Sequence, residues 1–367
     1  MIMNESENRY NGIFDESKDV LFYVGVSKKQ GLGHLVRSSV LMRAFQLKGF
    51  RISTVFDEPT DFPFEEELEK RIEIDYLSLY SDKSDFEVLL ESLQDKLFSF
   101  LVIDKYNLCS SFIEECKKWT TVVLIEDERR PELLPDIIVN HNIYASEDEY
   151  IDASLKKSVE VIAGERYTLL RKQFQTTTKK KVKEMKSLLI SIGGTDVKDL
   201  TYPLFKMICK LKKTGILNKE LKIFLLVKNI GENEQVFLNH DSSLELLSDV
   251  SDMAELMDSM DFAITACGST VYELINRKLP FIGIVIAENQ VSIGHMVEDK
   301  YSLTVVWDGH LKEKSDLIKE VYLNMCTFLS KVNEFNQLLM NSNIDGYGGI
   351  HIVERLQVIK RMSTESD

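Results

Sequence analysis

The chain lacks the features that mark membrane, secreted and nucleic-acid-binding proteins. No apolar run reaches the ~18 residues of a membrane-spanning helix, and the longest, residues 281–287, has the length of a strand. The opening MIMNESENRYNG is polar, without the basic start and apolar stretch of a secretory signal. Lys and Arg total 45 against 59 Asp and Glu, so the net charge is −14. We therefore expect neither nucleic-acid binding nor stable membrane insertion.

Cysteine and metal-ligand clusters are also scarce. The five cysteines are odd in number and scattered, and the closest pair, Cys109 and Cys116, fits no zinc spacing. Free, buried thiols in a reducing cytoplasm are the expectation. Apart from His34, the histidines form no ligand spacing and no Cys or Asp cluster accompanies them. We therefore expect no bound metal ion and no cofactor.

What is present is a repeated alternation of strand-like and helical segments. The chain has 367 residues, of which 44% are hydrophobic and 28% charged, which suits two globular domains. Short β-rich runs separated by helices predict parallel sheets buried on both faces, and hence an α/β fold. The expected strands are residues 20–26, 51–56, 100–104, 121–125, 136–139, 159–163, 187–192, 221–227, 261–266, 281–286 and 303–307.

A polar, basic stretch divides this alternation. Residues 175–186 read QTTTKKKVKEMK, and we interpret them as a linker. The expected organisation is a flexible tail (1–18), an N-terminal α/β domain (19–174), the linker, and a C-terminal α/β domain (187–367) ending in helices at 311–339 and 349–362. We expect two doubly wound, Rossmann-like domains facing each other across a cleft, with ligands at the carboxyl ends of the strands.

The first chemical motif is GLGHLVRS, residues 31–38, between the first strand and the first helix. It is an incomplete dinucleotide fingerprint, because Val36 stands where the third glycine would be. His34 lies at the expected helix start, with Arg37 one turn on and on the same side. The helix start disfavours imidazolium, and a neutral imidazole can accept a proton. The motif predicts His34 as a general base; the alternative is a capping or loop histidine.

Two glycine-containing turns predict an anion site in the second half. SIGGTD, residues 191–196, places Gly193 and Gly194 in a tight strand-to-helix turn that Thr195 or Asp196 could cap. The alternative is a plain turn. In ACGST, residues 266–270, Gly268 makes a turn, and Ser269 and Thr270 start a helix. Their hydroxyls and free N–H groups form an anion site suited to a diphosphate.

Two further positions lie near these turns. Glu273 is one turn into the helix that starts at ACGST, where its carboxylate could accept both hydroxyls of a ribose. The alternative for Glu273 is a capping-box glutamate. Asn289 and Gln290 open the next helix at another strand end, where they predict ligand contacts or an N-cap.

Together these blocks resemble one family, the UDP-2,4-diacetamido-2,4,6-trideoxy-β-L-altropyranose hydrolases of pseudaminic acid biosynthesis, with their spore-coat polysaccharide relatives. The resemblance implies a GT-B fold and a cytoplasmic, metal-independent enzyme that releases UDP from an activated amino sugar. The resembling segments, in order, are GLGHLVRSSVLMRAF, LVIDKYNL, VLIEDERR, AGERYTLLRKQF, LLISIGGTD, DMAELMDSMDFAITACGSTVYEL, LPFIGIVIAENQ and DGYGGIHIVERL.

The resemblance also implies roles for individual residues. His34 matches the histidine of the family's G-x-G-H motif and is the expected base. The G-S-T-x-x-E block falls on Gly268 to Glu273 and is expected to hold the diphosphate and the ribose; the N-Q pair is expected near the sugar and phosphate. We place the following with them as substrate-binding residues: Gly33, Arg37, Asp104, Tyr106, Gly193 and Gly194.

Three departures accompany the resemblance. Lys105 stands where the family usually has the histidine of D-H-Y, and Cys267 where it usually has a second glycine. Val36, Arg37 and Ser38 replace the frequent M-R-C after the histidine. The change at Lys105 bears on which sugar is bound, rather than on the proposed base.

Three activities compete on these residues. In the first, His34 activates water to attack the anomeric carbon of a UDP-sugar. In the second, a glycosyltransferase, His34 deprotonates a sugar or lipid acceptor, although the acidic residues 57–69 argue against docking on a membrane. The third is a nucleotide-sugar-binding protein without catalysis. We expect a monomeric UDP-sugar hydrolase.

Overall fold

The structure is a computed structural model of the chain. It describes residues 18–26, 33–60, 64, 70, 72–76, 85–127, 129–150, 159–176, 185–193, 196, 198–227, 243–307 and 312–365. The expected tail, apart from Lys18, and most of the expected linker lie outside the described residues.

A parallel sheet forms the centre of the first half. Its seven described strands run in the order β3-β2-β1-β4-β5-β6-β7, and each neighbouring pair is parallel. The strands are β1 (Asp19–Val24), β2 (Arg51–Phe56), β3 (Ile72–Tyr76), β4 (Phe100–Asp104), β5 (Thr121–Ile125), β6 (Ile137–Asn140) and β7 (Glu160–Ala163). The helices are α1 (Gly33–Leu47), α3 (Asp85–Asp95), α4 (Ser110–Lys117) and the 3-10 turn η2 (Glu147–Tyr150).

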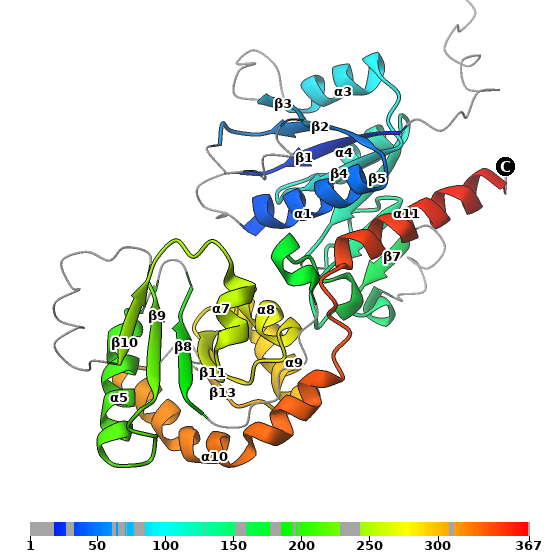
Figure 1. The fold of residues 1–367 in the computed structure, drawn as a ribbon. Helices are drawn as coiled ribbons and strands as arrows, with labels where there is room; N and C mark the ends of the chain where they lie inside the picture. Colours follow the sequence, from blue (N-terminus) through cyan, green and yellow to red (C-terminus); the bar gives the residue numbers. More distant parts are fainter. Residues whose placement is uncertain are drawn as a thin grey trace, which may run out of the picture. The chain divides into compact units, whose positions relative to one another are not determined.

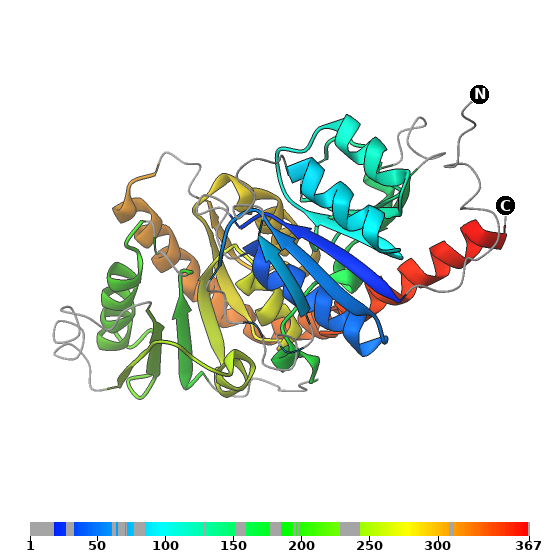
Figure 2. The same ribbon diagram turned by 90° about the horizontal axis from the view of Figure 1, so that it is seen from above.

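Both faces of this sheet are covered by helices (Figure 1; Figure 2). Successive residues of a strand point to opposite faces. Leu21 and Ile103 accordingly belong to a buried cluster with residues of α3 and α4. Phe22 and Phe100 face the other way and pack against Phe45 of α1. Burial on both sides explains why β1 and β4 are continuous apolar runs.

The second half repeats the design. Its six described strands are parallel, in the order β10-β9-β8-β11-β12-β13. They are β8 (Ser187–Ser191), β9 (Lys222–Leu226), β10 (Leu244–Leu247), β11 (Phe262–Ala266), β12 (Phe281–Val285) and β13 (Val305–Trp307). The helices are α5 (Thr201–Lys213), α7 (Met253–Ser259), α8 (Thr270–Asn276), α9 (Val291–Tyr301) and α10 (Lys314–Met340), with the 3-10 turns η3 (Glu165–Tyr167), η4 (Lys172–Gln175) and η5 (Glu288–Gln290).

The chain divides into two compact units. The first comprises residues 1–141, 146–163 and 349–367, and the second comprises residues 142–145 and 164–348. Helix α11 (Gly348–Glu365) thus lies almost wholly in the first unit, whereas the sequence pattern assigned it to the second domain. The reason is its contacts: Lys360 donates to the carbonyl of Ser99 and lies over the ring of Phe100, and Glu354 pairs with Lys48.

The predicted strands all match strands of the structure, within one or two residues at each end. Two strands were not predicted, β3 and β10, and both lie at the edge of their sheet. Their sequences, IEIDY and LELL, include charged residues, since an edge strand is not fully covered. Helix α1 ends shortly before Gly49, which has a φ of 84° and donates to the carbonyl of Gln46.

Candidate functional site

Each sheet reverses its strand order at one place, and the motifs cluster there. The order changes direction between β1 and β4 in the first sheet and between β8 and β11 in the second. Open α/β sheets bind ligands outside the carboxyl ends of their strands at such a point. His34 follows β1 and Asp104 ends β4, while SIGGTD follows β8 and ACGST follows β11.

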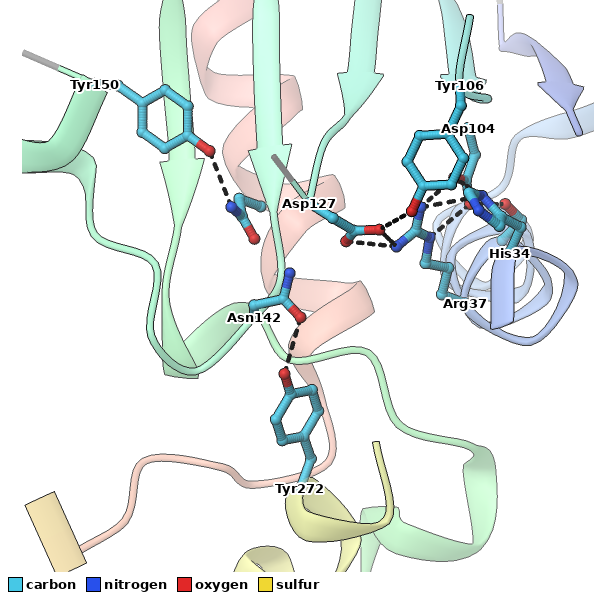
Figure 3. A network of polar contacts seen from close by, with 10 residues as sticks. His34, Arg37, Asp104, Tyr106, Asp127, Asn142, Tyr150 and Tyr272 are labelled. Carbon is cyan, nitrogen blue, oxygen red and sulfur yellow. Dashed lines mark hydrogen bonds and ion pairs between the residues drawn. The ribbon is translucent and has the colours of Figure 1, made fainter. Parts of the chain in front are cut away.

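The centre of the first site is the carboxylate of Asp104 (Figure 3). Its Oδ1 lies 2.6 Å from Nδ1 of His34 and 2.5 Å from Nη2 of Arg37. Its Oδ2 accepts from Nε of Arg37 and from the hydroxyl of Ser38, each at 2.8 Å. The carboxylate is fully buried but accepts four hydrogen bonds, so its desolvation is offset.

Arg37 joins two carboxylates. Besides Asp104, its Nη1 donates to both oxygens of Asp127, each at 2.6 Å. Burial acts to raise the pKa of Asp104, but the charge and hydrogen bonds of Arg37 hold it at about 2. Burial likewise opposes ionisation of Asp127, yet Arg37 keeps its pKa well below the usual range. Both carboxylates are therefore ionised at neutral pH.

This charge state fixes the tautomer of His34. An ionised Asp104 can only accept, so the 2.6 Å contact requires the hydrogen of the neutral imidazole to be on Nδ1. Arg37 also approaches Nδ1, at 3.1 Å, but Nδ1 then has no lone pair to offer it. The lone pair of the neutral ring is on Nε2. An imidazole oriented in this way by a carboxylate can take a proton at Nε2 and be stabilised as imidazolium.

Tyr106 completes the arrangement. Its hydroxyl donates to Oδ2 of Asp127 at 2.9 Å, and its ring meets that of His34 edge-on, with centroids 4.8 Å apart. Burial, and then the charge of Asp127, raises the pKa of Tyr106 to about 12, so the phenol stays protonated. The structure thus brings together four predicted residues: His34, Arg37, Asp104 and Tyr106. Gly33 lies beside them as the first residue of α1.

Asp127 and Ser38 were missed as site residues. Asp127 stands just after β5, within VLIEDERR, at the carboxyl edge where ligand contacts are expected. Ser38 lies four residues after His34 and one after Arg37, and all three are buried. For Ser38 the sequence offered a signal: with His34 and Arg37 it places three polar residues on the first turns of an otherwise apolar helix face.

The departure at Lys105 lies beside this cluster without joining it. Its ammonium donates to the hydroxyl of Tyr23 at 2.6 Å and lies 3.4 Å from a carboxylate oxygen of Asp57. The other oxygen of Asp57 accepts from the backbone N–H of Val26 at 2.7 Å. Lys105 therefore links the ends of β1 and β2 to that of β4.

The second unit contains the remaining predicted residues. Gly193 follows β8 with a φ of 87°, a conformation that favours glycine. Gly194 and Thr195 lie outside the described residues. The N-cap of α5 is Leu200, which has no side-chain capping bond. Asp196, one of the two predicted capping residues, lies four residues earlier, and its carboxylate accepts from the N–H groups of Leu200 and Thr201 at 2.8 and 3.0 Å.

Some polar groups of the ACGST block are already used within the protein, since the N–H of Gly268 donates to the carbonyl of Ala266 at 2.8 Å. Gly268 follows β11 and is half-buried, Ser269 is exposed at the N-cap of α8 and makes no capping hydrogen bond, and Thr270 begins the helix. The carboxylate of Glu273 does not form a capping box. Instead it accepts from Nη2 of Arg171 at 2.7 Å.

Glu273 is held in a largely desolvated position. Burial raises its pKa, and the charge of Arg171 opposes that effect. Arg171, whose side chain is 40% exposed, was not predicted as a site residue, although it lies in AGERYTLLRKQF. The ion pair therefore connects the segment AGERYTLLRKQF with helix α8, which follows the ACGST turn.

Gln290 lies at the same edge of the second sheet. Its Oε1 accepts from the N–H of Ile286 at 3.0 Å, and its Nε2 lies 3.9 Å from the position that a Cβ on Gly268 would take. Asn289 is exposed in η5. The N-cap of α9 is Gln290, without a side-chain capping bond, so the capping alternative for this pair is not found.

Cys267 points into the core, away from this polar edge. It is fully buried, and its sulfur lies 2.6 Å from where a Cβ on Gly283 would stand. Burial raises the pKa of this thiol to about 12. The expectation of buried thiols holds for Cys116, Cys209 and Cys267 but is wrong for Cys109 and Cys326, which are exposed.

The described part of the chain contains neither a metal-binding cluster nor a membrane-spanning helix. No group of three or more His, Cys, Asp or Glu side chains in it is placed to hold a metal ion. Among its helices, none has the length and apolar character needed to cross a bilayer.

Comparison with known proteins confirms the resemblance drawn from the motifs. No protein-family model matches the chain. The chain is 27% identical to the UDP-2,4-diacetamido-2,4,6-trideoxy-β-L-altropyranose hydrolase of Campylobacter jejuni, over 77% of this chain and 99% of the relative. It is 20% identical to the spore coat polysaccharide biosynthesis protein SpsG of Bacillus subtilis, over 82% of this chain and 87% of the relative.

A solved structure identifies the fold. The calicheamicin glycosyltransferase CalG4 superposes with a TM-score of 0.61 at 13% identity, covering 93% of this chain and 98% of that protein. The chain has the GT-B fold, as its motifs predicted. The likeness to the hydrolase supports an enzymatic function, whereas the likeness to the glycosyltransferase shows the fold alone.

Proposed function

We propose that the protein is a hydrolase that releases UDP from a UDP-activated diacetamido-trideoxy sugar. His34 takes a proton from water, the oxygen attacks the anomeric carbon, and the bond to the UDP oxygen breaks. The products are the free sugar and UDP. The observation that carries the proposal is the contact of His34 Nδ1 with Asp104, because it leaves Nε2 as the basic atom of the neutral ring.

The cluster has what a general base needs. Asp104 is fully buried and remains ionised, so it holds the imidazole in one orientation and stabilises the imidazolium that forms. The backbone of the α1 start and the ring of Tyr106 limit how the imidazole can move. A fixed base avoids part of the entropic cost of bringing base and water together.

We assign UDP to the second unit. The N–H groups at the start of α8 and the hydroxyls of Ser269 and Thr270 would hold the diphosphate, whose charge grows as the bond breaks. Glu273 would accept the ribose hydroxyls, with Arg171 fixing the carboxylate. Asn289 and Gln290 would lie near the sugar and phosphate, and the turn of Gly193 and Gly194 would help to hold the charge of the leaving UDP. The likeness to the hydrolase supports this assignment.

A glycosyltransferase is the second candidate. The likeness to the calicheamicin glycosyltransferase favours it, because an oriented histidine can deprotonate an acceptor hydroxyl as readily as water. The two candidates differ in whether turnover requires an acceptor.

The test is turnover of a panel of UDP-amino sugars in ¹⁸O-labelled water without acceptor. Hydrolysis at carbon predicts UDP release with the label on the anomeric oxygen of the sugar. Label on UDP would mean attack at phosphorus and contradict the mechanism. Turnover only after addition of a sugar or lipid acceptor would favour the transferase.

We further propose that the enzyme works without a divalent cation, as a cytoplasmic monomer in the biosynthesis of a pseudaminic-type acid or a surface polysaccharide. An arm of the same assay run after chelation and dialysis should give an unchanged rate. Activity restored only by magnesium or manganese would contradict metal independence.

A further inference from the structure

A buried histidine, His141, lies beside the cluster. His141 follows β6 and is 8% exposed, and neither of its ring nitrogens meets a partner among the described residues. An imidazole has two polar nitrogens, and burying both unpaired costs free energy. A buried side chain whose polar atoms lack partners in a native protein therefore needs an explanation.

The register of the sheet places His141 next to Asp127. Ile125 of β5 pairs with Val139 of β6, and two residues further on stand Asp127 and His141. Ile103 of β4 likewise pairs with Leu124 of β5, and three residues further on stand Tyr106 and Asp127. The hydrogen bond from Tyr106 to Asp127 bears out this alignment. Tyr106, Asp127 and His141 thus form a row along the carboxyl edge of the sheet.

The side chains on both sides of His141 are hydrogen-bonded, each within its own unit. The amide of Asn140 donates to the hydroxyl of Tyr150 at 2.9 Å, and the hydroxyl of Tyr272 donates to Asn142 at 2.8 Å (Figure 3). Unlike the side chains of its two neighbours, the ring of His141, the last residue of this part of the first unit, has no partner among the described residues. A buried polar group of this kind is available to bind a partner from outside.

The charges around His141 limit what it can bind. Burial, and then the charge of Arg37, lowers the pKa of His141 to about 4, so the ring is neutral at pH 7. The single positive charge of Arg37 is matched by two carboxylates, Asp104 and Asp127, which leaves the three groups with one net negative charge. A phosphate or carboxylate would be repelled here.

We propose that His141 binds an uncharged substituent of the sugar that both donates and accepts a hydrogen bond, an acylamino or a hydroxyl group. A neutral imidazole offers one donor and one acceptor, which suits such a group. This inference rests on the proposed function, since it assigns the sugar to the row of Tyr106, Asp127 and His141.

The experiment is a calorimetric titration in a His34→Asn background, where the sugar is not cleaved. Asn can still donate to Asp104, which should preserve the fold. The probes are UDP, UDP-glucose and UDP-2,4-diacetamido-2,4,6-trideoxyaltrose. The variants are His141→Leu, which has no polar atom, and His141→Gln, which keeps a donor and an acceptor. His351→Leu, on α11 of the first unit, is the matched control.

His141→Leu should weaken binding of the sugar nucleotide about tenfold, as loss of a buried partner implies. Binding of UDP should not change, and His141→Gln should restore part of the loss. A loss confined to the diacetamido sugar identifies an acylamino group; an equal loss for UDP-glucose identifies a hydroxyl. If His141→Gln alone folds, it should weaken the sugar nucleotides less than tenfold and spare UDP.

Unchanged binding of both sugar nucleotides in folded variants would overturn the inference and leave only a buried water at His141. An equal weakening of UDP would also overturn it, since the effect would not concern the sugar. If the parent protein fails to bind UDP at all, the proposed function itself is wrong, and the inference falls with it.

Discussion

Oδ1 of Asp104 lies 2.6 Å from Nδ1 of His34, and the two side chains come from opposite sides of the point where the first sheet reverses its strand order. Asp104 is the last residue of β4, and His34 is the second residue of the helix that follows β1. Neighbouring strands bring the pair together, although 70 residues separate them in the sequence.

The first prediction concerns His34→Asn. Removal of a general base typically lowers the rate about 100- to 10,000-fold, and we expect a loss of kcat in that range. Affinity for UDP and the melting temperature should stay close to those of the wild type, because Asn can still donate to Asp104. Steady-state kinetics and calorimetry measure these quantities, with His351→Asn as the control. A fully active His34→Asn enzyme would show that His34 has a structural role and is not the base.

The second prediction is a loss of stability in acid. The pKa of Asp104 is about 2 in the folded protein, against an ordinary value of 3.8, so the folded state binds its proton less readily than the unfolded state. The resulting stabilisation is present above pH 3.8 and is lost as the pH falls towards 2. A shift of this size corresponds to about 2 kcal/mol. The depressed pKa of Asp127 acts in the same direction.

Urea unfolding between pH 5 and pH 2.5 measures this effect. The free energy of unfolding should fall more steeply with decreasing pH in the wild type than in Asp104→Asn, which has no carboxyl to titrate. Equal slopes in the two proteins would show that Asp104 does not contribute.

The third prediction assigns the ribose to Glu273. UDP should raise the melting temperature of the wild type, as a ligand of the native state does. Glu273→Ala should lose most of that rise, because the carboxylate held by Arg171 would no longer be there to accept the ribose hydroxyls. Differential scanning fluorimetry measures the shift. Glu334→Ala, an exposed substitution on α10, should keep it in full. An undiminished shift in folded Glu273→Ala would argue against the ribose contact.

The fourth prediction concerns the attachment of α11. Burial lowers the pKa of Lys360 from 10.5 to about 8, so the unfolded state binds the proton more tightly than the folded state. Stability should therefore rise as the pH increases from about 8 towards 10.5. Lys360→Met should show a smaller rise over that range in chemical unfolding experiments. A rise as large as in the wild type would mean that other groups cause it.

Most strands could be predicted because they are buried on both faces and read as apolar runs. Strands β3 and β10 could not, since each lies at a sheet edge and includes charged residues. His34 was predictable because a glycine-bounded histidine at a helix start has a local signature. Asp127 and His141 have none: their importance comes from the register of β4, β5 and β6, which pairs residues far apart in sequence.

The charge balance of the site could not be predicted from the sequence either. Arg37 was predicted as a substrate-binding residue, yet its guanidinium contacts Asp104, Asp127 and Nδ1 of His34. Which carboxylates surround an arginine depends on tertiary packing, and helical spacing alone gives no information about it. The same holds for Arg171, whose partner Glu273 lies 102 residues away.

The path of the chain has a consequence for how the protein is made. Residues Ile352, Val353 and Leu356 of α11 are fully buried, and they belong to the unit that contains the N-terminal strands. During synthesis the core of the first unit is incomplete until α11 has left the ribosome, although the strands of its sheet emerge earlier. A gene fragment that stops at residue 163 would therefore encode an unfinished unit, with the binding surface for α11 exposed to aggregation.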